Sequence, residues 1–427
     1  MGEIEMSEIC VIGLGYIGLP TAILLSDGGF NVIGVDTSSY VIESLIRGRS
    51  NISEPGLSER LLLAIHERRF IASYDIPIAD TYIVAVPTPF NQDKSADLSA
   101  VFSVIEGIGR VMKPDSLVII ESTCPIGTTE ICRDKIFNIL RERNLAQDSE
   151  CINLAYCPER VLPGNIMEEI VTNDRIIGGI TPNASEKAEQ IYSRVIKGSL
   201  MLTNSRTAEM AKLIENSFRD TNIAFANEIS LIAEEVNVNP WEVIELANRH
   251  PRVNILQPGP GVGGHCIAVD PWFLVEATPG ISRIVKMARE VNDSIPKTVL
   301  DRFEKLRYDC LENGIYPLDV LIMGLTFKAN VADMRESPAL QITESIVRKY
   351  GDADHIHILE PNIDSLPVSI EDRARLTTDP LSNKNYDIVL ILVDHTAFNI
   401  DLVQEIVFRS RHIIDKRGLI RRLGVKN

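Results

Sequence analysis

The segment from Gly259 to Pro271, GPGVGGHCIAVDP, holds the residue types in this chain that are best suited to covalent chemistry. Its four glycines allow the backbone to approach a bound molecule closely. Cys266 lies in this flexible, polar stretch between His265 and Asp270, unlike a cysteine on an apolar strand. Next to a dinucleotide, such a thiol predicts aldehyde oxidation: sulfur adds to the carbonyl carbon, hydride leaves, and a thioester remains for hydrolysis.

Residues 9–36 show the pattern of a dinucleotide-binding unit, with an apolar strand, a glycine-rich turn, a helix and a second apolar strand. The turn contains Gly13, Gly15 and Gly18, and Asp36 ends the second strand 18 residues after the last of these glycines. The glycines allow a tight turn and close approach to a pyrophosphate at the helix N-terminus. Since Asp36 would accept hydrogen bonds from a ribose 2′-hydroxyl and repel a 2′-phosphate, we expect NAD and not NADP. A glycine-rich turn in another α/β fold is the alternative.

Further cofactor contacts are expected on this turn and at the ends of two later strands. Tyr16 and Ile17 belong to the turn, where their backbone N–H groups could face phosphate. Thr88 in VPTP and Thr123 in ESTCPIGTT follow apolar strands, where cofactor contacts of parallel sheets belong. For each threonine, a helix-cap or turn role is an equal alternative.

A continuous helical pattern runs over residues 206–248 and carries a second candidate site. Lys212, Asn216 and Arg219 are spaced i, i+4 and i+7, so they share a sector about 60° wide. The same face continues through three apolar or small residues, Ile223, Ala226 and Ser230. We therefore expect this face to enter the interior and Lys212 to line a cavity, with a solvated polar face as the alternative.

Strands that alternate with helices over both halves of the chain predict an α/β protein with parallel sheets. With 427 residues, 45% of them hydrophobic, the chain is long enough for two or three domains. We expect a doubly wound, Rossmann-like NAD-binding domain over residues 1–203 and a long central helical segment over 204–310. A smaller α/β domain is expected over 311–427.

The composition excludes several classes of function. The net charge of −16 and the absence of a basic stripe argue against nucleic-acid binding, and a bound anion would need a local cluster of Lys and Arg. The seven irregularly spaced cysteines predict reduced thiols and no disulfide framework. Without a CxxC or HExxH pattern, no metal site is expected. No signal peptide is recognisable and no apolar run approaches the roughly 20 residues of a membrane span, so we expect a cytoplasmic protein.

Seven ordered motifs resemble a known family over essentially the whole chain. They are GLGYIGLP, VPTP, ESTCPIGTT, CPERVLPGN, AKLIENSFRDTNIAFANE, NRHPRVNILQPGPGVGGHCIAVDPWFL and GLTFKANVADMRESPA. Together they are similar to the UDP-glucose and UDP-mannuronate-type nucleotide-sugar 6-dehydrogenases. The resemblance implies a UDP-sugar substrate whose C6 hydroxyl is oxidised to a carboxylate in two steps, with two NAD per sugar. It also implies that the C-terminal domain binds the nucleotide sugar and that the central helices form a homodimer.

The resemblance assigns catalytic roles to five residues. Cys266 would be the nucleophile of the second oxidation. Lys212 would stabilise the developing oxyanion or move the alcohol proton, with Asn216 beside it. Asp270 would position a water or assist proton transfer, and Glu159 would help to release the acid from the thioester.

The resemblance also implies a set of residues around the sugar nucleotide. The residues that would border the substrate are Arg160, Val161, Lys212, Asn216, Arg219 and Gly263. His250 and Arg252 would reach it, either within one chain or across a dimer interface. Phe327, Lys328 and Lys416 would place the uridine diphosphate, and Arg335 would meet the cofactor side. Taken alone, Lys416 could be a solvated charge at a strand end, and His250 before a proline could simply end a helix.

The expected sugar is UDP-N-acetyl-D-mannosamine, for surface polysaccharide or glycoconjugate synthesis. Glu159-Arg160-Val161, His265 and Val269 stand where UDP-glucose enzymes tend to carry Glu-Phe-Leu, Ser and Lys. UDP-N-acetylglucosamine, UDP-N-acetylgalactosamine and UDP-glucose remain alternatives. A two-electron hydroxyacid dehydrogenase, which needs no thiol, and a catalytically silent NAD-binding protein are alternatives of other classes. Three histidines of the C-terminal region have no identifiable partner and are expected to pack or face water: His355, His357 and His395.

Overall fold

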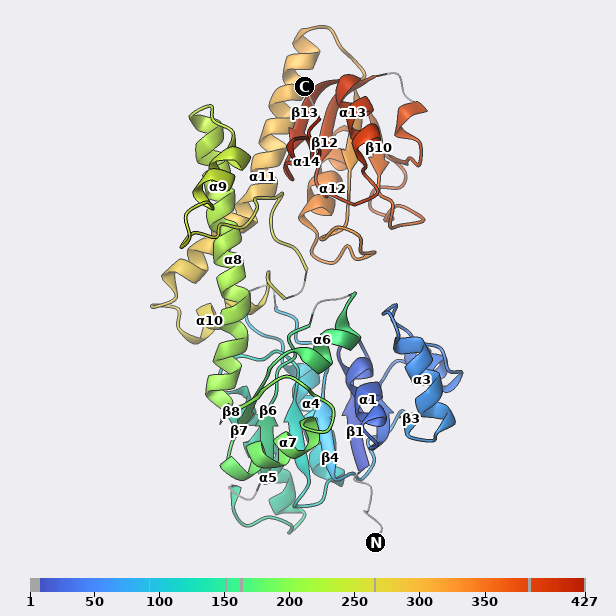
Figure 1. Ribbon diagram of the computed structural model, residues 1–427, viewed down its shortest axis with the longest axis vertical. Helices are drawn as coiled ribbons and strands as arrows, with labels where there is room; N and C mark the ends of the chain where they lie inside the picture. The colour runs from blue at the N-terminus through green and yellow to red at the C-terminus, as the bar shows by residue number, and fades with distance from the viewer. Residues whose placement is uncertain are drawn as a thin grey trace. The chain divides into compact units, whose positions relative to one another are not determined.

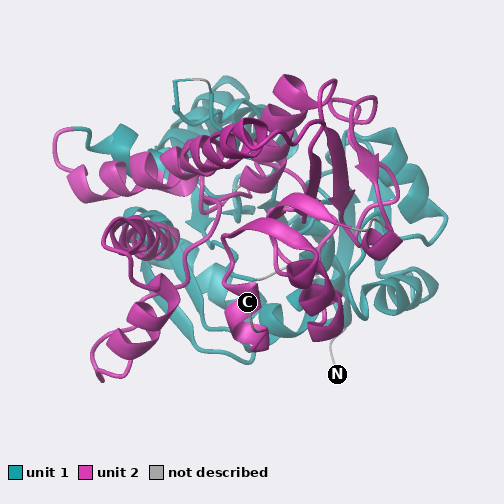
Figure 2. Ribbon diagram, turned by 90° about the horizontal axis from the view of Figure 1, so that it is seen from above, with its two compact units in different colours: residues 1–215, 272–279 teal, residues 216–271, 280–427 magenta. Residues whose placement is uncertain are grey.

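The computed structural model describes residues 8–91, 93–149, 152–161, 164–264, 266–382 and 385–425. The chain forms two compact units (Figure 2). The first contains the chain up to Glu215 together with Trp272–Pro279, and the second contains Asn216–Pro271 and the chain from Gly280 onward. His265, which adjoins the predicted nucleophile, lies outside the described residues, as do three other residues of interest in the sequence: Cys151, Leu162 and Pro163.

The first unit is built around a sheet with the strand order β3-β2-β1-β4-β5-β6-β7-β8. Its strands are β1 (Glu8–Ile12), β2 (Asn31–Val35), β3 (Phe70–Ser73), β4 (Thr81–Val84), β5 (Leu117–Ile120), β6 (Asn153–Tyr156), β7 (Arg175–Gly179) and β8 (Leu200–Asn204). The strands pair in parallel, except that β6 and β7 are antiparallel. The apolar runs of β4, β5 and β6 are buried along their whole length, as strands covered on both faces require.

Helices cover this sheet and turn it into a doubly wound domain (Figure 1). They are α1 (Gly18–Asp27), α2 (Ser39–Ile46), α3 (Leu57–His66), α4 (Ser99–Val111), α5 (Thr128–Glu142), α6 (Ile166–Thr172) and α7 (Pro182–Tyr192). Helix α1 packs against β1, β2 and α3, and α4 packs against α5. The strand order reverses direction between β1 and β4, which is where sheets of this type bind their ligands. The strand, turn, helix and strand predicted for residues 9–36 are confirmed.

The central region contains α8 (Ser205–Glu235), α9 (Pro240–Ala247), α10 (Asp270–Ala277) and α11 (Arg283–Glu312). The helical character predicted for residues 206–248 is confirmed, but the segment is divided into two helices, because the chain leaves the helical conformation between α8 and α9. Asn237 has a left-handed φ of +55°, and the Asn239 side chain accepts hydrogen bonds from the backbone N–H groups of Trp241 and Glu242. Pro240 then begins α9, at the position where a missing N–H is tolerated.

The C-terminal part of the second unit is a smaller α/β domain with the strand order β11-β10-β9-β12-β13. Its strands, all paired in parallel, are β9 (Asp319–Met323), β10 (His355–Leu359), β11 (Arg375–Leu376), β12 (Tyr386–Ile391) and β13 (Ser410–Asp415). The helical segments are α12 (Pro338–Tyr350), η2 (Pro380–Ser382), α13 (Ile400–Phe408) and α14 (Leu419–Leu423). The predicted α/β class, with two α/β halves and a helical middle, is confirmed. Among the described residues, no helix combines the length and apolar character needed to cross a bilayer.

Candidate active site

The glycines of the first turn are required by its geometry. Gly13 has a φ of +91°, and a Cβ there would lie 2.5 Å from the carbonyl oxygen of Ala85. A Cβ on Gly18 would lie 1.7 Å from the carbonyl oxygen of Gly13, whereas Gly15 faces open space with no such atom within 4 Å. The turn therefore packs tightly on its own strands and leaves room at Gly15, near the N-terminus of α1, where a diphosphate would meet backbone N–H groups.

Asp36 is anchored at the end of β2 in a position suited to a ribose. Its Oδ2 accepts from the backbone N–H of Leu14 at 2.9 Å, and its Oδ1 accepts from that of Ser38 at 2.8 Å. Asn51 donates to the carbonyl oxygen of Leu14 at 3.1 Å, and its own Oδ1 is buried without a partner among the described residues. A carboxylate with lone pairs to spare and an unused acceptor fit the hydroxyl groups of NAD. No spacing rule in the sequence points to Asn51.

The other predicted cofactor residues fall in two places. Tyr16 and Ile17 lie on the glycine turn, and Ile17 is the N-cap residue of α1. Thr88 and Thr123 follow β4 and β5, so they share the carboxyl edge of the sheet with the turn. Arg335 belongs to the second unit, where its guanidinium pairs with Asp333 at 2.6 Å. Its contact with the cofactor stays a prediction.

Glu159 is part of a buried charged cluster that the sequence did not reveal. It follows β6, is 9% exposed, and forms an ion pair with Arg175. The same guanidinium pairs with Glu121 at 2.8 Å, and the hydroxyl of Tyr192 donates to Glu121 at 2.7 Å. Burial acts to lower the pKa of Arg175, but Glu121 and the other neighbours raise it above its usual value. Arg175 therefore stays charged and holds both carboxylates.

Arg160 and Val161 continue the chain from Glu159. The backbone N–H of Arg160 donates to Glu159 at 2.7 Å, and its guanidinium pairs with Glu215 at 2.6 Å. The same guanidinium also donates to the carbonyl oxygen of Asp174. Val161 is half-buried against the core of the first unit. Arg160 is thus held by acidic groups of its own unit, and its contact with a substrate stays a prediction.

Helix α8 carries a buried polar face close to the predicted one. Lys212 is 9% exposed, and Asn216, one turn later, donates from Nδ2 to Oδ2 of Asp270 at 2.5 Å. Asp270 is 2% exposed and begins α10. Arg219 is exposed, and the fully buried residue at this level of the helix is its neighbour Asp220. The structure therefore joins Asn216 to Asp270 and places Arg219 on the helix surface.

Asp220 starts a chain of hydrogen bonds that reaches the glycine-rich loop. Its Oδ1 accepts from Nη1 of Arg289 at 2.5 Å and from Nδ2 of Asn292 at 2.8 Å. Asn227 donates to Oδ1 of Asn292 at 2.9 Å and accepts from the backbone N–H of Gly259 at 2.9 Å. Burial raises the pKa of Asp220, although Arg289 acts in the opposite sense. The network fixes the start of the loop to α8 and α11.

The glycines before Cys266 pack against the chain's own C-terminal domain. A Cβ on Gly263 would lie 2.5 Å from the carbonyl oxygen of Glu336 and 2.9 Å from Cβ of Phe327. A Cβ on Gly264, whose φ is +78°, would lie 3.0 Å from the Phe327 ring. At these two positions the close approach expected from the sequence is made to the protein itself. This packing fixes the chain at Gly263 and Gly264.

Cys266 is the exposed cysteine among those described. Its carbonyl oxygen accepts from the backbone N–H groups of Val269 at 3.0 Å and Asp270 at 2.9 Å, so a tight turn leads directly into α10. Burial raises the pKa of Cys10 and of Cys132 to about 12, which makes them poor nucleophiles. The accessible thiol thus lies four residues from the buried Asp270 carboxylate.

The predicted uridine diphosphate residues lie at the carboxyl edge of the second sheet. Phe327 is half-buried and Lys328 is exposed, both on the loop after β9. Lys416 follows β13, is 6% exposed, and pairs with Glu234 of α8 at 3.4 Å. Burial lowers the pKa of Lys416, and Glu234 partly offsets this effect. Lys416 is therefore not a solvated strand-end charge.

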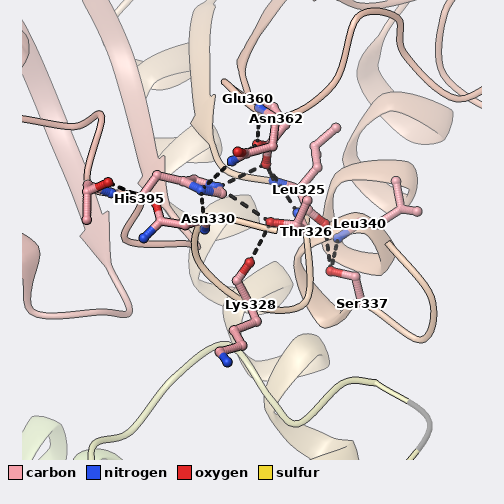
Figure 3. Close-up of polar contacts among 10 residues, drawn as sticks. Leu325, Thr326, Lys328, Asn330, Ser337, Leu340, Glu360, Asn362 and His395 are labelled. Carbon is pink, nitrogen blue, oxygen red and sulfur yellow. Dashed lines mark hydrogen bonds and ion pairs between the residues drawn. The ribbon is translucent and has the colours of Figure 1, made fainter. Parts of the chain in front are cut away.

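His250 and Arg252 lie on the segment after α9. Both are exposed, and the backbone N–H of Arg252 donates to Nδ1 of His250 at 3.3 Å. This bond joins the two residues to each other, and their reach to a substrate stays a prediction. Of the three histidines expected to lack a partner, His395 is different: its ring is buried and bonded to Glu360 at 3.0 Å (Figure 3). His355 and His357 lie 3.4 and 3.5 Å from Asp319.

Comparison with known protein families covers most of the chain. Residues 7–196 match the NAD binding domain of the UDP-glucose/GDP-mannose dehydrogenase family, residues 206–294 its central domain, and residues 321–422 its UDP binding domain. The chain is 43% identical to UDP-N-acetyl-D-mannosamine dehydrogenase of Escherichia coli over 98% of its length and 100% of the relative. It is 44% identical to NDP-N-acetyl-D-galactosaminuronic acid dehydrogenase of Ralstonia solanacearum over 98% of its length and 97% of the relative.

Solved structures agree with this comparison. The UDP-D-ManNAc dehydrogenase of Pyrococcus horikoshii superposes with a TM-score of 0.84 at 36% identity, covering 97% of this chain and 96% of that one. The UDP-N-acetyl-mannosamine dehydrogenase of Staphylococcus aureus gives a TM-score of 0.81 at 36% identity, covering 97% and 95% of the two chains.

Proposed function

The chain belongs to the UDP-glucose/GDP-mannose dehydrogenase family, and we propose that it oxidises the C6 hydroxymethyl group of UDP-N-acetyl-D-mannosamine to a carboxylate. It is an NAD-dependent oxidoreductase that acts on a nucleotide sugar. Similarity over the full length to UDP-N-acetyl-D-mannosamine dehydrogenases supports this sugar. The equally similar Ralstonia relative favours UDP-N-acetylgalactosamine as the second candidate.

The observation that carries the reaction is the exposed thiol of Cys266, on a loop packed through Gly263 and Gly264 and followed by the buried Asp270, which accepts a hydrogen bond from Asn216. Bound NAD supplies one function, the uptake of hydride in each of two oxidations. Gly13, Gly15 and Asp36 would hold it, with Thr88 and Thr123 at the same sheet edge.

Cys266 performs the covalent step. Its thiolate sulfur bonds to the aldehyde carbon that the first oxidation produces, and the carbonyl electron pair moves to oxygen. The second oxidation leaves a thioester. Water then attacks the carbonyl carbon, and the carbon–sulfur bond breaks to give the carboxylic acid and the thiolate.

The remaining groups move protons and stabilise charge. Lys212, a buried ammonium group, stabilises the oxygen that becomes negative when sulfur adds. Asp270, held by Asn216, positions the water that cleaves the thioester. Glu159, held by Arg175, assists the release of the acid.

We also propose a homodimer formed through α8. This helix carries apolar side chains that are 46–67% exposed at helical spacing: Met210, Ile214, Phe218, Phe225 and Ile232. An exposed apolar stripe of this kind is typical of a surface that a partner covers. We propose that residues 1–203 bind NAD, that residues 204–310 form the central helical segment, and that residues 311–427 bind UDP. We also propose a cytoplasmic location, where thiols stay reduced, and a product used for surface polysaccharide or glycoconjugate synthesis.

A panel of UDP-sugars tests the substrate. NADH formation would be measured by absorbance with UDP-N-acetyl-D-mannosamine, UDP-N-acetylglucosamine, UDP-N-acetylgalactosamine and UDP-glucose. We expect kcat/KM to be highest for the mannosamine, with two NADH per sugar. A higher value for another UDP-sugar of the panel would replace the proposed sugar, and the absence of NADH with every member would refute the activity.

A further inference from the structure

Two buried residues of the C-terminal domain, Glu360 and His395, form an ion-pair geometry that the proposed reaction does not use. Glu360 follows β10 and His395 follows β12, on either side of β9 at the carboxyl edge of the sheet. Nε2 of His395 lies 3.0 Å from Oε2 of Glu360, and the residues are 1% and 4% exposed. Burying such polar groups lowers the stability of the fold unless all of their hydrogen bonds are made. The hydrogen-bond partners of Glu360 and His395 therefore indicate which segment the pair stabilises.

Asn362 is hydrogen-bonded to both residues, and their other partners include the two ends of one turn. Oε2 of Glu360 accepts from the backbone N–H groups of Leu325 at 2.8 Å and Thr326 at 3.3 Å. Nδ1 of His395 accepts from the backbone N–H of Asn330 at 3.0 Å. These bonds place the ring proton on Nε2, facing the carboxylate. Figure 3 shows the resulting cluster, which clamps residues 325–330 at both ends.

The rest of the turn is equally constrained. Asn330 has a left-handed φ of +63°, and its Oδ1 accepts from the backbone N–H of Thr396 at 3.0 Å. Ser337 donates to the carbonyl oxygen of Leu325 at 2.6 Å. Burial acts to raise the pKa of Glu360, but hydrogen bonds from His395 and from Leu325 outweigh it and lower the pKa to about 2. The carboxylate therefore remains ionised and accepts all of these bonds near neutral pH.

Phe327 and Lys328 are the residues between the clamped ends. Phe327 is fixed from its other side by the packing of Gly263 and Gly264. The side chain of Lys328 points away from the cluster (Figure 3) and is exposed. The turn thus presents one half-buried ring and one exposed ammonium group, as binding of an aromatic base and a phosphate requires.

We propose that Glu360 and His395 are positioning residues for the uridine diphosphate part of the substrate, which hold the turn 325–330 so that Phe327 and Lys328 meet the ligand without rearrangement. The inference rests on the proposed function, because it takes Phe327 and Lys328 as the residues that contact UDP. The inference gives a role to Glu360 and His395, which would act through the turn and not by touching the ligand or the cofactor.

The test compares UDP binding and catalysis in His395→Phe, which keeps a ring but removes its bonds to Glu360, to the backbone of Asn330 and to Asn362. We expect the Kd for UDP, from calorimetry, and the KM for the UDP-sugar to rise about tenfold, with kcat within about twofold of wild type. Arg307→Met is the matched control, because it breaks the 2.6 Å buried pair with Asp354 at the opposite end of β10. It should lower Tm while leaving the Kd for UDP within about twofold.

A second variant, Asn330→Ala, tests the same role if His395→Phe does not fold. Asn330→Ala changes an exposed residue, removes the acceptor for Thr396, and puts alanine at a left-handed φ, so the Kd for UDP should rise about threefold. Unchanged UDP affinity in both variants, or an equal loss in Arg307→Met, would overturn the positioning role.

Lys328→Met separates this inference from the proposed function. If Lys328→Met weakens UDP binding and His395→Phe does not, the positioning role alone fails. If Lys328→Met leaves UDP binding unchanged, the assignment of UDP to this turn fails, and the inference fails with it. In the double variant, we expect less than the product of the two single effects, because His395 acts through the turn that carries Lys328. A full product would contradict the inference.

Discussion

Asn216 and Asp270 are 54 positions apart in the sequence, and the side chain of one donates a hydrogen bond to the other at 2.5 Å. The bond joins the middle of the long helix α8 to the first residue of α10, four positions after the exposed thiol of Cys266. Asn216 and Asp270, which belong to separate sequence motifs, therefore form one hydrogen-bonded pair.

Asn216→Ala tests the role of this pair. It removes the donor to a carboxylate that is 2% exposed. We expect kcat to fall about 10- to 100-fold, because losing a hydrogen bond to a charged group costs roughly 1.5–3 kcal/mol. Steady-state kinetics with saturating NAD would measure this, with Tm recorded alongside. A kcat within about twofold of wild type would show that Asp270 does not need this donor.

Gly263→Ala tests whether the thiol loop must pack on the C-terminal domain. The new methyl group would lie 2.5 Å from the carbonyl oxygen of Glu336, so the loop has to shift. We expect kcat/KM to fall at least about tenfold, because misplacing a nucleophile by a fraction of an ångström is costly. Gly280→Ala is the matched control, since its Cβ would meet no atom within 4 Å, and it should keep near-wild-type kinetics. Similar kinetics for both variants would contradict the packing argument.

The sequence predicts the glycine turn at residues 13–18, the place of Asp36 at the end of β2 and the burial of Lys212. These features have local signals, namely a fixed glycine spacing and the pattern along one face of a helix. The pairs of Arg289 with Asp220 and of His395 with Glu360 could not be predicted, since the partners lie 69 and 35 positions apart and no sequence spacing links them. The break before Pro240 has a local signal in Asn239 and Pro240, but the hydrophobic periodicity that continues across it favours a continuous helical pattern. Long-range polar pairs depend on how the domains fold, and a single sequence does not encode them as a pattern.

Glu360 should make the free energy of unfolding depend on pH in the acidic range. Its pKa of about 2 lies below its usual 4.5, so the stabilisation is complete above about pH 4.5 and is lost as the pH falls towards 2. The full effect is roughly 3 kcal/mol. Glu360→Gln should therefore be less stable than wild type at pH 7, and the difference should shrink as the pH falls from about 5 to 3. Urea unfolding at several pH values would measure it. A difference that stays constant would show that the Glu360 carboxylate is not the cause.

The proposed dimer predicts a change in mass when the stripe on α8 becomes charged. Phe218 and Phe225 are 67% and 50% exposed. Replacing both with Glu should convert the dimer to a monomer, because two desolvated charges would have no partner. Phe408→Glu is the control, since Phe408 is 86% exposed on α13, outside the stripe. Sedimentation or light scattering reports the mass. A double variant that remains a dimer would refute this interface.

The most direct test of covalent catalysis counts NADH per sugar in wild type and in Cys266→Ser, together with the intact mass of protein quenched during turnover. The thiol mechanism predicts two NADH per sugar and an acyl adduct on wild-type Cys266. In Cys266→Ser it predicts no adduct and a rate of acid formation lower by at least about a thousandfold. Wild-type levels of acid from Cys266→Ser, or a single NADH per sugar from wild type, would contradict it.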